Sequence, residues 1–139
     1  MTDADFLAAF EEGSLPPQEF DHRAHLRTAC LYLERLPFLE ACIAMRDGLR
    51  AFAGRVGKDG LYHETITVAF MSIVAERRAL APGLAWDALL ARHPELCERT
   101  LLARYYAPQR LASPAARACF VLDERTVAGG AAQHAELAR

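Results

Sequence analysis

The chain has 139 residues, of which 53% are apolar and 24% are charged, and its formal net charge at pH 7 is −2. This length suits one domain with one hydrophobic core, and the composition excludes a disordered or fibrous protein. Acidic and basic residues are interspersed and form no basic patch, which argues against nucleic acid as a partner.

The first residues, MTDADFLAAFEEG, are acidic and lack the basic and apolar regions of a secretory signal. No stretch reaches the roughly 18 uninterrupted apolar residues that span a membrane. We therefore expect a cytoplasmic protein with no membrane partner. In that reducing compartment the four cysteines, which are far apart and form no CxxC pair, are expected to be small buried side chains. They are Cys30, Cys42, Cys97 and Cys119.

Alanine and leucine are abundant and β-branched runs are scarce, so the chain is expected to be helical throughout. The first helix is predicted from Asp3 to Glu12, with Gly13 as its end. An extended link with two prolines follows over residues 14–19. Asp21 is then the expected N-cap of a second helix that runs through Arg35, because its carboxylate can accept from the free N–H groups of the first turn.

Pro37 separates this helix from a third, predicted over about Phe38 to Ala53. A glycine-containing loop, residues 54–60, leads to a fourth helix from about Leu61 to Leu80. Ser113 is the expected N-cap of the last helix. The remaining predicted helices are Trp86 to Arg92, Pro94 to Tyr106, and the one that follows Ser113 through Phe120.

These elements predict an all-α fold, a single-domain compact helical bundle of about six helices, in residues 1–124. After Asp123 the chain loses its large apolar residues. We therefore expect residues 125–139 to form a flexible C-terminal tail.

Three histidines and a glutamate stand out at the starts of two predicted helices. His22 and His25 are three residues apart, so they leave the second helix on one side, close to its apolar stripe. His63 is expected on the inward face of the fourth helix, next to Glu64. Imidazole and carboxylate groups bind zinc, iron, copper and nickel. The pattern predicts a divalent metal ion held by His22, His25 and His63, with Glu64 as fourth ligand or as general base.

An alternative reading of the same four residues needs no metal. The histidines would bond to backbone groups or carboxylates near the helix starts, and Glu64 would favour the positive end of a helix dipole. The HETIT segment lacks the second histidine of a zincin helix, because that position is Thr67, so a zincin peptidase is not expected.

Tyrosines and arginines form a second set of candidates. An arginine can bind a carboxylate or phosphate, and a tyrosine hydroxyl can donate a proton. The same side chains more often pair with carboxylates or cap helix ends. The candidate catalytic residues from the whole sequence are Glu64, Tyr62, Tyr105 and Arg117.

Three segments, FDHRAHLRTACLYL, GLYHETITVAF and ARYYAPQRLASPAARACFVLDE, carry a resemblance to known sequences. In this order they resemble a family of small, uncharacterised bacterial proteins that are all-helical, over about residues 18 to 124. The resemblance implies a site at the histidine and tyrosine positions. It implies no particular reaction.

The sequence thus predicts a metal-binding protein, in one form a small metalloenzyme that acts on a small-molecule substrate. Several alternatives remain open. One is a non-catalytic module that binds a metal or a small molecule. Another is a metal-free protein with structural histidines that works by association, for example as a homodimer. A third is a metal-free acid–base enzyme that uses His63 and Glu64.

Overall fold

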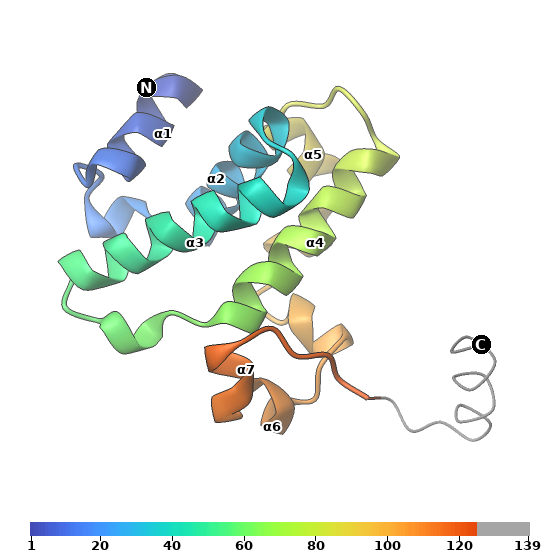
Figure 1. Cartoon of the computed structure of the whole chain (residues 1–139). Coiled ribbons are helices and arrows are strands. Elements are labelled where there is room, and N and C mark those ends of the chain that lie inside the picture. Colours follow the sequence, from blue (N-terminus) through green and yellow to red (C-terminus); the bar gives the residue numbers. More distant parts are fainter. Residues whose placement is uncertain (125–139) are drawn as a thin grey trace.

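A computed structural model describes residues 1–124, and these residues are helical with no strand among them (Figure 1). The predicted all-α bundle is confirmed. The predicted C-terminal tail, residues 125–139, lies outside the described residues. The α-helices are α1 (Asp3–Glu12), α2 (His22–Arg35), α3 (Phe38–Arg55), α4 (Glu64–Leu80), α5 (Trp86–Arg92), α6 (Pro108–Leu111) and α7 (Pro114–Ala118). Short 3-10 helices lie between them: η1 (Pro17–Glu19), η2 (Asp59–Leu61), η3 (Pro94–Cys97) and η4 (Leu101–Arg104).

Helices α2, α3 and α4 pack against one another at the centre of the fold. Helix α1 lies against α2 and α3, α5 lies against α2, and α6 and α7 lie near the start of α4 (Figure 1). The core has two parts, which meet at α2. One lies between α1, α2 and α3 and contains Phe6, Phe10, Ala29 and Met45. The other joins α2, α4, α5 and the short turns and contains Leu26, Val74, Leu89, Leu96 and Leu101.

Several predicted boundaries are confirmed. Helix α1 and helix α5 have the predicted bounds, and α3 is longer than predicted, since it continues to Arg55. The N-cap of α2 is Asp21, whose Oδ1 accepts from the Ala24 N–H at 2.9 Å. A carboxylate at this position satisfies an amide that has no partner within the helix.

Two other predictions about helices are wrong. Helix α4 begins at Glu64 rather than Leu61, because η2 precedes it and His63, with extended backbone, is its N-cap. The expected helix from Pro94 to Tyr106 is replaced by η3 and η4. Leu96 and Leu101 are both buried in the same core, at 0% and 2% exposure. Residues five apart on a continuous α-helix would point about 140° away from each other, so the turns allow both to face inward. The short helix α6 was not predicted.

The cysteine prediction is half right. Cys30 and Cys42 are buried in the helical core, whereas Cys97 and Cys119 are exposed. Cys97 is the last residue of η3, and Cys119 follows the end of α7. Both therefore sit where a short element ends at the surface.

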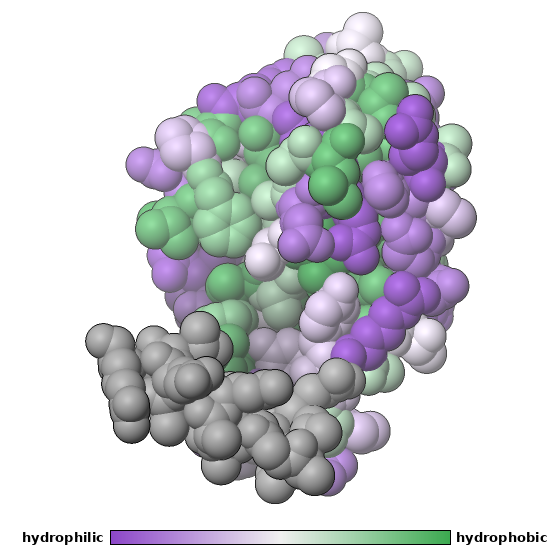
Figure 2. Space-filling view, turned by 90° about the vertical axis from the view of Figure 1, so that its right-hand side faces the viewer, coloured by the Kyte–Doolittle hydropathy of each residue, from purple (hydrophilic) through white to green (hydrophobic). Residues whose placement is uncertain are grey.

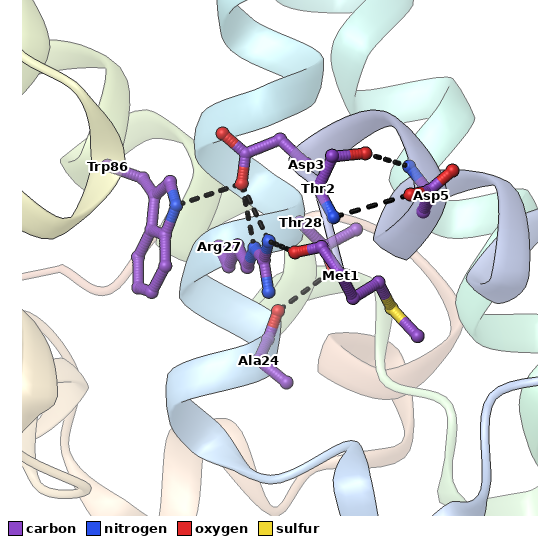
Figure 3. Close-up of polar contacts among 8 residues, drawn as sticks. All are labelled: Met1, Thr2, Asp3, Asp5, Ala24, Arg27, Thr28 and Trp86. Carbon is purple, nitrogen blue, oxygen red and sulfur yellow. Dashed lines mark hydrogen bonds and ion pairs between the residues drawn. The ribbon is translucent and has the colours of Figure 1, made fainter.

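Helix α1 is held to α2 and α5 by one carboxylate (Figure 3). Asp3 Oδ1 accepts from Arg27 Nε at 3.0 Å, from Arg27 Nη2 at 2.7 Å and from Trp86 Nε1 at 3.1 Å. The Arg27 guanidinium also lies 4.3 Å from the centroid of the Phe6 ring. Three elements distant in the sequence thus meet at the carboxylate of Asp3.

Large apolar side chains at the surface are spread over several elements: Leu39 and Ile43 on α3, Leu61 in η2, and Ile66 and Leu80 on α4. Figure 2 shows that, outside the grey atoms, apolar (green) side chains on the viewed face occur in separate groups with hydrophilic (purple) ones between them. No helix among residues 1–124 combines the length and apolarity needed to cross a bilayer.

Candidate functional site

A pocket of about 450 Å³ brings together residues from η1, α2, α3 and the start of α4. Most of its lining is apolar and includes three phenylalanines: Phe20, Phe52 and Phe70. The polar side chains that line it are His22, His25, Lys58, Tyr62, His63 and Thr67. The three histidines that the sequence singles out therefore line one cavity, although they come from two helix starts.

The His63 ring makes hydrogen bonds to two different parts of the chain. As N-cap of α4, its Nδ1 accepts from the Ile66 N–H at 3.1 Å. Its Nε2 lies 2.7 Å from the Leu111 carbonyl oxygen, which can only accept, so Nε2 donates. An Nδ1 that accepts carries no proton, so the ring is the neutral Nε2–H tautomer. Both ring nitrogens of this buried histidine are thus occupied.

His22 has one ring nitrogen in use. Nε2 lies 3.0 Å from the Leu96 carbonyl oxygen and donates to it. Nδ1 makes no hydrogen bond within residues 1–124. The ring centroid lies 5.7 Å from that of Phe70, another residue of the pocket lining. The Leu96 carbonyl therefore fixes the ring and leaves Nδ1 for a bound group.

His25 is stacked on Phe20, with the ring centroids 4.1 Å apart. Burial, followed by the nearby His22, lowers the pKa of His25 to about 4, although Asp21 opposes the shift. The imidazole is therefore uncharged at neutral pH. An uncharged ring in an apolar pocket can accept or donate one hydrogen bond, or bind a metal through its free nitrogen.

Tyr62 and Glu64 bond to each other. The Tyr62 hydroxyl donates to Glu64 Oε1 at 2.5 Å, and the Arg50 guanidinium lies 4.8 Å from the centre of the Tyr62 ring. Burial, followed by this hydrogen bond, raises the pKa of Tyr62. Tyr62 lines the pocket and Glu64 does not. The Glu64 carboxylate, predicted as a metal ligand or general base, thus accepts a hydrogen bond from Tyr62.

Arg117 and Tyr105 lie outside the pocket lining. Arg117 Nη1 donates to the carbonyl oxygens of Gly60 at 2.5 Å and Tyr62 at 3.1 Å, so it holds the segment that leads into α4. Tyr105 is 43% exposed. It neighbours Arg77, and a hydrogen bond between them raises the pKa of that guanidinium.

Thr65 is a buried residue of the YHETIT segment that the sequence reasoning missed. Its Oγ1 donates to the Cys119 carbonyl oxygen at 2.7 Å and accepts from the Val121 N–H at 3.0 Å. The Tyr106 hydroxyl donates to the Val121 carbonyl oxygen at 2.8 Å. These bonds hold residues 119–121 against the start of α4. The signal in the sequence is a threonine on the inward face of an otherwise apolar helix, where a hydroxyl needs a partner.

The phenylalanines and the lysine of the lining were not among the predicted site residues either. Phe20 is the first residue of the first histidine segment, and Lys58 is the single lysine of the chain. Neither feature indicates a pocket by itself. The lining residues are scattered between residues 17 and 71, and only the fold brings them together.

The side chains predicted to hold a metal do not form a complete ligand set. Among residues 1–124, no group of three or more His, Cys, Asp and Glu side chains is placed to hold a metal ion. His63 uses both ring nitrogens, and Glu64 accepts from Tyr62. His22 and His25 remain as two nitrogen ligands, whereas catalytic zinc sites usually have three protein ligands.

Comparison of the chain with protein-family models, with curated proteins and with solved structures gives no match. The resemblance to a bacterial family drawn from the three sequence segments therefore stays a prediction. What the residues themselves offer is a mainly apolar pocket with two imidazoles available for a bound molecule.

Proposed function

We propose that the protein binds a small, largely apolar molecule in the pocket between η1, α2, α3 and α4, and that His22 and His25 make the polar contacts with it. The observation that carries this proposal is the cavity of about 450 Å³ with its aromatic lining. Small-molecule sites are typically clefts of about 300–1,000 Å³, lined by apolar side chains with a few polar groups.

The hydrogen bonds of the lining support the choice of these two histidines. The Thr67 hydroxyl donates to the His63 carbonyl oxygen at 2.8 Å, and the Tyr62 hydroxyl donates to Glu64. His63 uses both ring nitrogens. His22 Nδ1 and the ring of His25 are the nitrogens left for a ligand. The predictions of a cytoplasmic location and of a homodimer rest on the sequence alone.

The proposal can be tested by a substitution on α3 that fills the pocket. Ala53 is buried and lines the pocket, whereas Ala51, on the same helix, is exposed. Ala53→Leu adds apolar volume inside the cavity, and Ala51→Leu adds the same volume outside it. We expect the wild type to bind the uncharged dye 1-N-phenylnaphthylamine with a rise in fluorescence. Ala53→Leu should weaken that binding about tenfold, because it occupies the site.

Ala51→Leu should bind the dye as the wild type does, and circular dichroism should show that both variants are folded. Dye binding that Ala53→Leu leaves unchanged would place the dye elsewhere and contradict the proposal. A wild type that binds neither the dye nor any member of a small-molecule set in thermal-shift assays would also contradict it.

One observation favours metal binding as a second candidate function. Metal-ligating histidines usually donate their other ring N–H to a carbonyl or carboxylate, and His22 does so to Leu96. His22 Nδ1 and a nitrogen of His25 would supply two ligands, and the bound molecule would supply the rest. A divalent ion held in this way would polarise that molecule.

Elemental mass spectrometry of untagged protein tests the metal candidate. We expect near-stoichiometric zinc, iron, copper or nickel in the wild type and its loss from folded His22→Ala and His25→Ala variants. A wild type that carries no metal and takes up none on reconstitution would refute metal binding but would leave the small-molecule proposal intact.

A further inference from the structure

We propose that the molecule bound in this pocket is an amphiphilic carboxylate, whose negative end pairs with Lys58 and whose apolar part fills the cavity. This inference rests on the proposed small-molecule function and adds the chemical class of the ligand.

Lys58 is the only lysine or arginine in the lining. The lining contains no aspartate and no glutamate, and its histidines include His63 as a neutral tautomer and His25, uncharged because of its burial. No carboxylate of the lining offsets the charge of Lys58. A carboxylate is favoured there over a cation, which would meet like charge and no counter-charge.

The loop that holds Lys58 is tied to the end of α3. The Lys58 N–H donates to the Ala53 carbonyl oxygen at 2.8 Å, and the preceding Gly57 has a φ of +72°, a conformation that glycine adopts without strain. The backbone of Lys58 is therefore fixed, while its exposed side chain lines the pocket.

The Lys58 ammonium makes no ion pair within residues 1–124. The carboxylate of the adjacent Asp59 lies over Gly54, since its Oδ1 is 3.2 Å from where a Cβ on Gly54 would be. The charge of Lys58 is thus left for a group that enters the pocket.

The separation of the charged residue from the apolar residues of the lining also orients the ligand. Phe20 is buried and Phe52 and Phe70 are half-buried, whereas Lys58, in the connecting loop, is exposed. Placing a carboxylate against the phenylalanine rings would cost free energy, because these rings offer no hydrogen-bond donor to compensate its lost hydration. The anion therefore stays with the exposed Lys58, and the hydrocarbon part contacts the phenylalanine rings.

Decanoate and its uncharged counterpart decanol test the proposal by displacement of 1-N-phenylnaphthylamine at pH 7.5. We expect the wild type to bind decanoate more tightly than decanol. Lys58→Met keeps the apolar stem of the side chain and removes its charge. Decanoate should then bind about fivefold more weakly, which is the effect expected for the loss of one partly exposed ion pair. The binding of decanol should be unaffected. Arg99→Met removes the same charge at an exposed residue outside the lining and should change neither affinity.

The outcomes separate this inference from the function on which it rests. Equal displacement by both compounds, or an equal effect of Lys58→Met on both, would overturn the carboxylate while leaving small-molecule binding in place. Equal weakening of decanoate by Arg99→Met would overturn a specific role for Lys58. No binding of the dye or of either compound would overturn both proposals.

Discussion

His63 illustrates how a residue type can suggest one role and its bonds another. Its ring caps α4 through the Ile66 amide and holds the Leu111 carbonyl with its second nitrogen. A metal at either nitrogen would displace one of these bonds, and losing an N-cap alone costs about 0.5–2 kcal/mol. The sequence places His63 on an inward face, but it does not show that residue 111 returns to this ring.

At the residue scale, His25 predicts a pH dependence of stability. Its pKa is lowered from 6.5 to about 4 in the folded protein, so between these values the unfolded chain binds the additional proton. The free energy of unfolding therefore falls as the pH drops from 6.5 to 4. We expect His25 to account for a loss of about 2 kcal/mol between pH 7 and pH 5.

Urea unfolding of the wild type and of His25→Gln at both pH values measures this loss. The variant has no titrating ring at this position, so its stability should fall less than that of the wild type by about the same 2 kcal/mol. Parallel pH dependence in the two proteins would show that the imidazole is not protected from protonation in the fold.

At the scale of the elements, α1 and α3 approach closely because Gly48 has no side chain. A Cβ built on Gly48 would lie 2.3 Å from Cε2 of Phe10, a ring with 0% exposure. Phe10 is enclosed and cannot move aside without disturbing the core. Gly48 is thus part of the packing of this interface.

This contact predicts opposite effects for two glycines of the same helix. Replacing a glycine inside a helix by alanine normally stabilises it by about 1 kcal/mol. Gly48→Ala should instead lower the free energy of unfolding by about 1–3 kcal/mol, because the new methyl group overlaps the Phe10 ring. Gly54→Ala meets only the end of the Asp59 side chain at 3.2 Å and should be neutral or stabilising. Thermal unfolding of both variants checks this, and similar effects would contradict it.

The elements that could be predicted from the sequence are those with strong local signals. Helix α1 ends at Gly13 in a left-handed conformation, and α2 begins after the carboxylate of Asp21. The Pro94 to Tyr106 region gave a helical pattern but folds into turns, because burial of both Leu96 and Leu101 outweighs local propensity.

The candidate site was predictable only in part, and for a similar reason. His22, His25, Tyr62 and His63 do line one pocket. Helical spacing places His22 and His25 on one side of α2, whereas Tyr62 and His63 precede the first turn of α4. Long-range bonds decide which of their atoms are free, and these bonds have no local signature. The Leu96 carbonyl lies 74 residues after His22 in the chain.

At the scale of the whole molecule, the docking of α1 depends on the contact of Asp3 with Arg27 and Trp86. Asp3→Ala leaves the Trp86 N–H and the Arg27 guanidinium without this acceptor. We expect a loss of about 1 kcal/mol of stability, since the ion pair is partly exposed, and a shift in tryptophan emission. Trp86 is the only tryptophan of the chain, so tryptophan emission reports on the surroundings of this one side chain.

Asp47→Ala is the control for this prediction. It removes an exposed carboxylate whose ion pair is with its neighbour Arg46. Its emission spectrum should match that of the wild type. An unchanged spectrum in Asp3→Ala would mean that Asp3 does not hold Trp86 in solution.

The bonds between the start of α4 and the later chain also bear on how the protein forms during translation. A nascent chain that has emerged only as far as α5 contains the residues that line the pocket, but not the Leu111 carbonyl that orients His63 or the backbone of residues 119 and 121 that pairs with Thr65. Synthesis proceeds from the N-terminus, so helices α1 to α3 can pack before these partners exist. On the ribosome, the wall of the pocket at His63 is therefore completed last.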